Sequence, residues 1–107
     1  MSDSPFLAMQ RVELLLKSVL RGMDADALGP DEKKAVANIR RLMVDARLDV
    51  RDYELSETRE EQLKKAAAGK KRLAKLQANI LAASLVFGPA DVAQLSAQLA
   101  QIESNLI

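Results

Sequence analysis

The chain has 107 residues, which suits one domain with a single hydrophobic core, and we expect residues 1–107 to form that domain. Its 16 basic and 15 acidic residues give a net charge of +1, too small for a general attraction to nucleic acid or anionic membranes. Cysteine and histidine are absent, which excludes disulfides, thiolate metal sites, Cys–His pairs and Ser-His-Asp triads. We therefore expect a protein that is not an enzyme and that needs no cofactor or metal.

The amino-terminal segment lacks the pattern of a signal peptide. No basic residue precedes its first apolar run, and Arg11, Glu13 and Lys17 interrupt that run. No uninterrupted apolar stretch is long enough to span a bilayer. We expect a soluble, cytoplasmic protein without a membrane partner.

Apolar residues at alternating spacings of three and four predict a first helix near 6–22. Its apolar stripe consists of Met9, Val12, Leu16, Val19 and Met23. Ser4 can cap this helix, and Pro5 suits its first turn because proline lacks the amide hydrogen that would stay unpaired there.

The loop from Asp24 to Gly29 begins like a calcium-binding EF-hand loop, with carboxylates at alternating positions before a glycine. The fifth position is Leu28 and the twelfth is Ala35, where that loop needs oxygen ligands. We therefore interpret the segment as an ordinary connection whose acids favour the start of the next helix.

Pro30, Asp31 and Glu32 suit a helix amino terminus and predict a second helix near 31–54. Its stripe consists of Ala35, Ile39, Leu42, Ala46, Val50 and Tyr53. A strand over Val44–Val50 is an alternative, since apolar and charged residues alternate there. We favour the helix because no turn signal bounds that run.

A third helix is predicted near 57–87, after a break at which Thr58 and Glu61 resemble a capping box. Its stripe consists of Ala66, Leu73, Leu76, Ile80, Ala83 and Phe87, with Gly69 at the missing step. No glycine or proline forces the break, so one continuous helix from Pro30 to Val86 is an alternative. If separate, the third helix would be the longest and would overhang its neighbours.

Gly88 and Pro89 end the third helix and predict a fourth near 90–105. Its seam is coiled-coil-like and consists of Val92, Leu95, Leu99, Ile102 and Leu106. Either this seam packs inside the monomer, or part of it pairs with another copy or another protein. The fold we predict is all-α, an antiparallel four-helix bundle with a long third helix.

Six basic residues and no acid lie between Gln62 and Ala90: Lys64, Lys65, Lys70, Lys71, Arg72 and Lys75. At about 100° per residue, most of them share one face of the third helix. That face could bind phosphates, or it could be a solvated surface partly neutralised by Asp45, Asp49 and Asp52 of the second helix. No aromatic residue interleaves with the lysines, so base stacking has no support.

The leading functional hypothesis is a non-catalytic interaction module, an adaptor or regulator that associates with itself or with a protein partner. Its predicted interface residues are Leu95, Leu99, Ile102 and Leu106. The alternative is a nucleic-acid-associated regulator that binds phosphates through Lys64, Lys65, Lys71, Arg72 and Lys75. An enzyme is the third possibility, since Asp45 and Asp49 share a helix face, but no nucleophile accompanies them.

Overall fold

The computed structural model describes residues 4–107, and no strand occurs in that range. The α-helices are α1 (Pro5–Arg21), α2 (Pro30–Leu55), α3 (Arg59–Ala82), α4 (Ser84–Phe87) and α5 (Pro89–Asn105), and a 3-10 turn, η1 (Ala25–Ala27), follows α1. The all-α prediction is confirmed. The alternative strand over Val44–Val50 is wrong, because these residues lie within α2.

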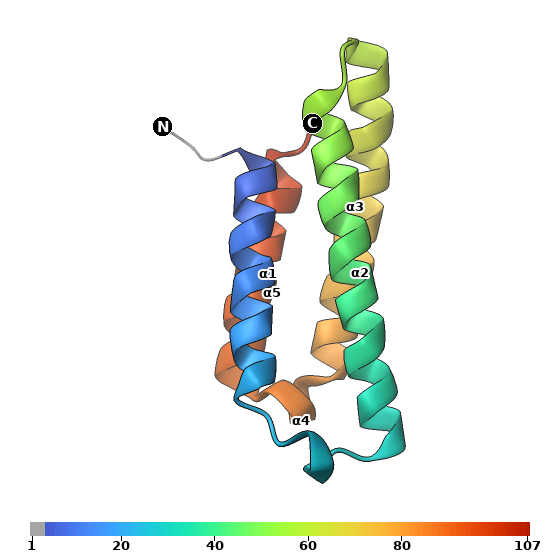
Figure 1. Cartoon of the computed structure of the whole chain (residues 1–107). Helices are drawn as coiled ribbons and strands as arrows, with labels where there is room; N and C mark the ends of the chain where they lie inside the picture. Colours follow the sequence, from blue (N-terminus) through green and yellow to red (C-terminus); the bar gives the residue numbers. More distant parts are fainter. Residues whose placement is uncertain (1–3) are drawn as a thin grey trace.

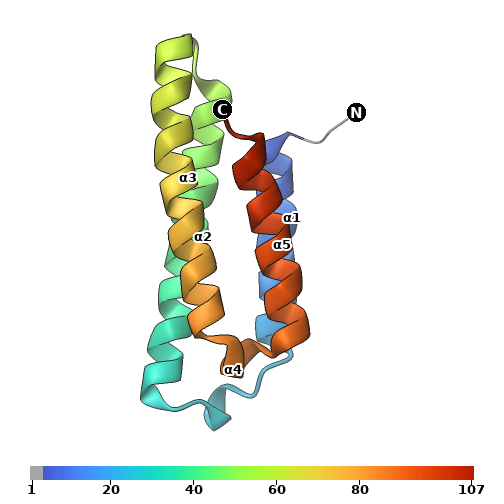
Figure 2. The ribbon, with the colours of Figure 1, turned by 180° about the vertical axis from the view of Figure 1, so that it is seen from behind.

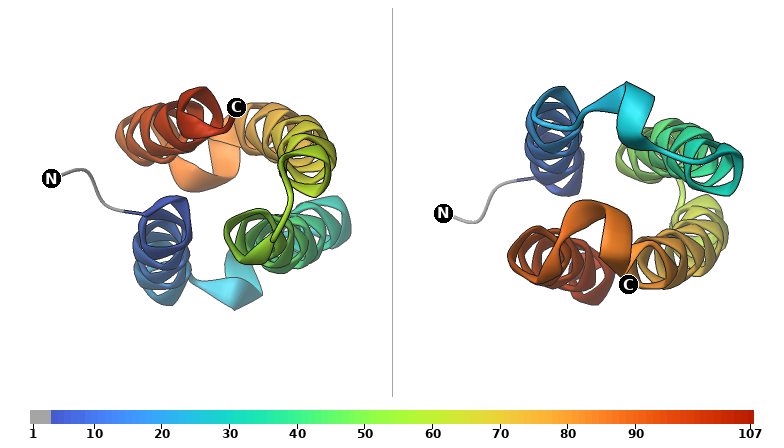
Figure 3. Two further views of the ribbon diagram at one scale, coloured as in Figure 1. Left: turned by 90° about the horizontal axis from the view of Figure 1, so that it is seen from above. Right: turned by 90° about the horizontal axis from the view of Figure 1, so that it is seen from below.

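The four long helices lie side by side, and each runs opposite to the one before it (Figure 1). The view from behind shows α5 beside α3, and the views along the helices show all four around one centre (Figures 2 and 3). α2 packs most extensively on α3, α5 packs on both α3 and α1, and α1 also contacts α2. This is the packing of a helical bundle, with one shared core.

The helix starts depend on local hydrogen bonds that the sequence indicates. Ser4 Oγ accepts a hydrogen bond from the amide of Leu7 at 3.1 Å, and Thr58 Oγ1 accepts one from the amide of Glu61 at 3.1 Å. The cap at Thr58 separates α2 from α3, so the alternative of one continuous helix is wrong. Gly88, at a φ of +85°, lets the chain turn sharply between α4 and α5.

The prediction that the third helix is the longest is wrong: α2 has 26 residues and α3 has 24. The predicted helix 57–87 is interrupted at Ala83, and the chain turns into the short α4. This turn buries Phe87 and leaves Leu85 fully exposed. The three-four apolar spacing continues through the interruption, so the sequence pattern does not indicate it. The α2–α3 hairpin does project beyond the ends of α1 and α5 (Figure 1).

The core is built from aliphatic side chains with one tyrosine and one phenylalanine, as the composition requires. Its largest fully buried members are Met9, Val12, Ile39, Met43, Val50, Leu73, Leu76, Ile80, Leu95, Leu99 and Ile102. No polar or charged residue is buried among those that the structure describes. Burial of apolar surface is therefore what holds the helices together.

Candidate functional site

The predicted protein interface on α5 lies in the core of the monomer. Leu95 and Leu99 have no exposed surface, and Ile102 and Leu106 expose only 2% and 3%. Leu106 also packs against α3, where a Cβ on Gly69 would lie 3.1 Å from its Cδ1 atom. Of the two interpretations of this seam, packing inside the monomer is confirmed, and the expectation of an exposed interface at these four residues is wrong.

The basic face of α3 is partly neutralised by α2, in the way that the acids of the second helix predict. Arg72 Nε donates to Asp49 Oδ2 at 3.1 Å, and Arg72 Nη1 lies 3.4 Å from Asp45 Oδ2. Lys65 Nζ lies 3.9 Å from Asp52 Oδ2. Two of the five predicted phosphate-binding residues therefore form ion pairs that bridge α2 and α3.

The other three predicted phosphate-binding residues, Lys64, Lys71 and Lys75, face solvent. Lys64 lies 3.9 Å from Glu60, one turn earlier on the same helix. Within residues 4–107, Lys71 and Lys75 have no carboxylate at ion-pair distance, and both are exposed. The structure thus reduces the predicted phosphate-binding cluster to two unpaired, solvent-facing lysines and the weakly paired Lys64.

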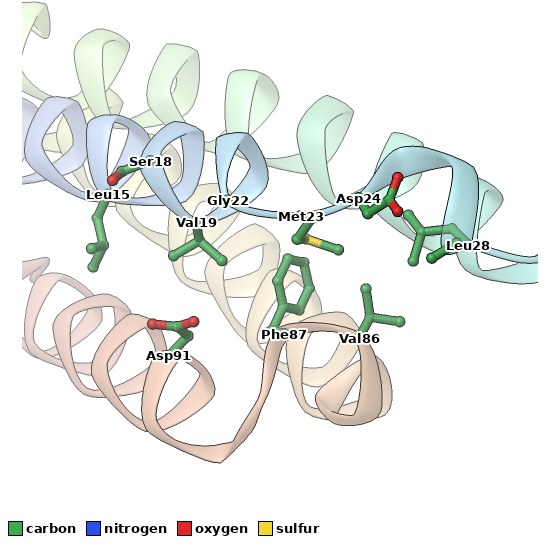
Figure 4. Close-up of a pocket in the computed structure, with 11 residues that line it drawn as sticks. Leu15, Ser18, Val19, Gly22, Met23, Asp24, Leu28, Val86, Phe87 and Asp91 are labelled. Carbon is green, nitrogen blue, oxygen red and sulfur yellow. The ribbon is translucent and has the colours of Figure 1, made fainter.

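An open cleft of about 640 Å³ lies where the end of α1 meets α4 and the start of α5. Val19, Met23 and Phe87 form its apolar wall and point toward one another (Figure 4). Two carboxylates, those of Asp24 and Asp91, also line it.

Both carboxylates of this cleft have structural roles. Asp24 Oδ1 accepts a hydrogen bond from the amide of Asp26 at 3.1 Å, which closes the turn before η1. Asp91 lies in the first turn of α5, where a negative charge favours the helix. No group of three or more potential metal ligands occurs in the part of the chain that the structure describes.

A second depression, which we call the α1–α2 groove, runs along the outside of the molecule between α1 and α2. It consists of two adjoining cavities of about 370 and 490 Å³ that share Leu20 and Arg40. Its lining residues are Glu13, Leu16, Lys17, Leu20, Met23, Leu28, Lys33, Val36, Ala37, Arg40, Met43, Val44 and Arg47. The floor is aliphatic, and the charged residues come from the flanking helix faces.

The rim of the α1–α2 groove carries an excess of positive charge. Arg47 Nη1 donates to both carboxylate oxygens of Glu13, at 3.2 and 3.0 Å, so these two charges neutralise each other. Lys17, Lys33 and Arg40 are exposed and form no ion pair with any described residue. Three uncompensated cations therefore flank an apolar floor.

The sequence contains a signal for the apolar floor that α2 gives this groove, and the stripe pattern of α2 does not use it. Val36 and Met43 follow Ala35 and Leu42 of the stripe by one position each, which widens the apolar arc of α2 by about 100° toward α1. Arg40 lies between them on the same side. Only the packing of α1 against α2 brings Lys17 to the opposite rim.

Several large apolar side chains stay exposed although the core is complete. The described residues of this kind are Leu7, Leu14, Val44, Leu48, Leu55, Leu63, Leu81, Leu85 and Ile107. Val44 lines the α1–α2 groove, and Leu48 lies one helical turn after it on α2. At the groove, a solvent-facing apolar surface thus has both a concave shape and a basic rim.

None of the helices within residues 4–107 combines the length and the hydropathy that crossing a bilayer requires. No protein-family model matches this sequence, and comparison with curated proteins and with solved structures returns no match. The functional inference therefore depends on the geometry of the groove and of the basic face.

Proposed function

We propose that the chain is a non-catalytic helical module that binds a protein partner through the α1–α2 groove. One observation carries this proposal: an aliphatic floor open to solvent lies between basic side chains that have no ion-pair partner among the described residues. Contiguous apolar surface with a polar rim is typical of protein interaction sites.

The fold supports this proposal because it can hold the groove rigid. We infer an antiparallel four-helix bundle, in which α1 and α2 each pack on a further helix behind them. The floor of the groove includes the core residues Leu16 and Met43, and partly exposed side chains such as Val44 supply its accessible apolar surface. A partner would bury Val44, which is 39% exposed, together with the edge of Leu20.

Catalysis has less support. Asp45 and Asp49, the carboxylates considered as an acid–base pair, are both engaged by Arg72. The cleft near Phe87 offers two further carboxylates, but each stabilises a turn or a helix start. A general acid or base needs a free proton-accepting atom within reach of substrate, and these groups lack an accompanying nucleophile.

Site-directed photocrosslinking tests the proposal. A photoreactive phenylalanine analogue replaces Val44 in the groove or, as a matched control, Leu81 on α3, which is 56% exposed and lies outside the groove. In cells that express the protein, we expect a discrete protein adduct from the analogue at position 44 and none from the analogue at position 81. The adduct from position 44 should disappear when Arg40→Glu is added. Equal adducts from both positions, or none from position 44, would contradict the proposal.

The mass of the adduct separates the two kinds of protein partner. An adduct of twice 11.7 kDa identifies a second copy of the chain, and any other mass identifies a different protein. Sedimentation equilibrium of the purified protein at two concentrations measures self-association independently of the crosslinker.

Phosphate binding is the second candidate function, favoured by the exposed and unpaired Lys71 and Lys75. Such binding would weaken steeply with added salt, since each neutralised phosphate releases condensed counterions. A gel-shift assay at low salt with the Lys71→Glu, Lys75→Glu variant tests it. If the wild-type protein shifts no oligonucleotide at low salt, this candidate is eliminated, and the groove proposal is unaffected.

A further inference from the structure

We propose that the α1–α2 groove receives an acidic amphipathic helix of the partner protein. The apolar side chains of that helix would lie on the floor, and its glutamates or aspartates would face the basic rim. This inference rests on the proposed function and specifies the chemistry of the partner.

The shape of the groove suits a helix. It follows α2 from Lys33 to Arg47, and at 1.5 Å per residue this length is about 20 Å, or roughly four turns. Floor residues come from both flanking helices, among them Leu20 of α1 and Val36 of α2. An added helix with apolar residues at spacings of three and four could place them along that floor, which is the usual arrangement of helix-in-groove recognition.

The charge of the rim selects an acidic helix. Lys17 comes from the α1 side and Arg40 from the α2 side, and neither forms an ion pair with a described residue. Glu13 supplies the one carboxylate among the described residues that line the groove, and Arg47 already binds it. Carboxylates on both flanks of the incoming helix would therefore meet uncompensated cations, and the arginine guanidinium can bind a carboxylate through two hydrogen bonds.

Two other occupants fit these observations less well. None of the groove-lining residues is aromatic, so the bases of a single-stranded nucleic acid would find no stacking surface. A second copy of this chain offers no acidic amphipathic face on α5, which exposes residues such as Ala93, Ala97 and Gln101, or on the second half of α3, which exposes Lys71 and Lys75.

Two designed peptides test the inference on the intact protein. Each is an 18-residue labelled helix with leucines at spacings of three and four, and one carries glutamates and the other lysines on its remaining face. Fluorescence anisotropy gives the Kd, and amide chemical shifts of the protein locate the peptide. We expect the acidic peptide to bind, to shift the signals of Leu20 and Val44, and to leave that of Ala97 unchanged.

Charge reversal at the rim supplies the matched comparison. Lys17→Glu with Arg40→Glu should weaken binding of the acidic peptide at least about tenfold, or ~1.4 kcal/mol, and strengthen binding of the lysine peptide. Lys71→Glu with Lys75→Glu changes the net charge equally on α3, outside the groove, and should leave the affinity within about threefold. All four side chains are exposed, so both variants should fold.

Any other result of the peptide experiments contradicts a specific claim about the groove. If the lysine peptide binds the wild-type groove as tightly as the acidic one, the acidic partner is refuted, and the groove remains a helix-binding site. If neither peptide shifts the groove signals, the proposed function fails as well. If both double variants weaken the acidic peptide equally, binding is a nonspecific charge effect and the inference is wrong. Displacement of the acidic peptide by an oligonucleotide would assign the groove to nucleic acid.

Discussion

Replacing Leu99 by alanine tests whether α5 belongs to the core of the monomer. Leu99 has no exposed surface and lies on the helix that packs against both α1 and α3. Truncating a fully buried leucine to alanine lowers the free energy of unfolding of a protein by about 3–5 kcal/mol, because the lost hydrophobic transfer energy and the cost of the cavity add. A domain of this size has a total stability of roughly 5–15 kcal/mol, so we expect a large loss without complete unfolding.

The same substitution at Leu85 is the control, because this side chain is 100% exposed on the short α4. Leu85→Ala removes the same atoms but no packing, so we expect a change of less than about 0.5 kcal/mol. Denaturant unfolding followed by circular dichroism at 222 nm measures both variants. The denaturant dependence of the free energy should stay constant, since the surface exposed on unfolding hardly changes.

The two variants together can refute the placement of α5. If Leu99→Ala costs less than about 1 kcal/mol, the side chain is not packed as the structure has it. If the midpoint of the wild-type protein rises with protein concentration, folding is coupled to association, and part of the core is supplied by another copy. Either result would return the α5 seam to the list of candidate interfaces.

Substitutions at three further positions test individual contacts, each by the same unfolding measurement. Gly69→Ala should stabilise α3 by up to about 1 kcal/mol, because alanine has the higher helix propensity. The added Cβ would meet only the flexible end of the Leu106 side chain, at 3.1 Å. A loss of stability would show that the Leu106 side chain cannot move away. Thr58→Ala should lower the free energy of unfolding by about 1 kcal/mol, and Thr58→Ser by much less, because serine keeps the hydroxyl that caps α3. Equal losses in the two variants would show that the hydroxyl does not cap the helix. Asp49→Asn weakens the partly exposed ion pair with Arg72, and it should cost less than about 1 kcal/mol at low salt and nothing measurable at 1 M salt. A salt-independent loss would refute the ion-pair explanation.

The helices could be predicted from the sequence because their signals are local. Ser4, Thr58 and Gly88 act within a few residues of their own position, and the three-four spacing repeats within each helix. The predicted boundaries accordingly agree with the observed ones to within one or two residues, apart from the end of α3. That end depends on where Phe87 finds space in the core, which is a tertiary property.

The ion pairs between α2 and α3 were also predictable, and the groove was not. Asp45, Asp49 and Asp52 lie on one face of α2, and a neighbouring antiparallel helix with Arg72 must meet them. The groove instead depends on the distance between α1 and α2, and on Lys17 and Arg40 reaching opposite rims. No spacing within either helix specifies that distance.

The apolar seam of α5 was predicted as an interface, and it lies in the core for a physical reason. That reason also determines how the binding experiments are interpreted. The most regular apolar seam in a small helical protein is the one that folding needs first, because a core of aliphatic side chains must bury nearly all its large residues. A partner can use only the apolar surface that folding leaves exposed, as at Val44. Loss of binding after a substitution on α5 would therefore report unfolding. Substitutions at the exposed rim, such as Arg40→Glu, can separate the loss of a partner from the loss of the fold.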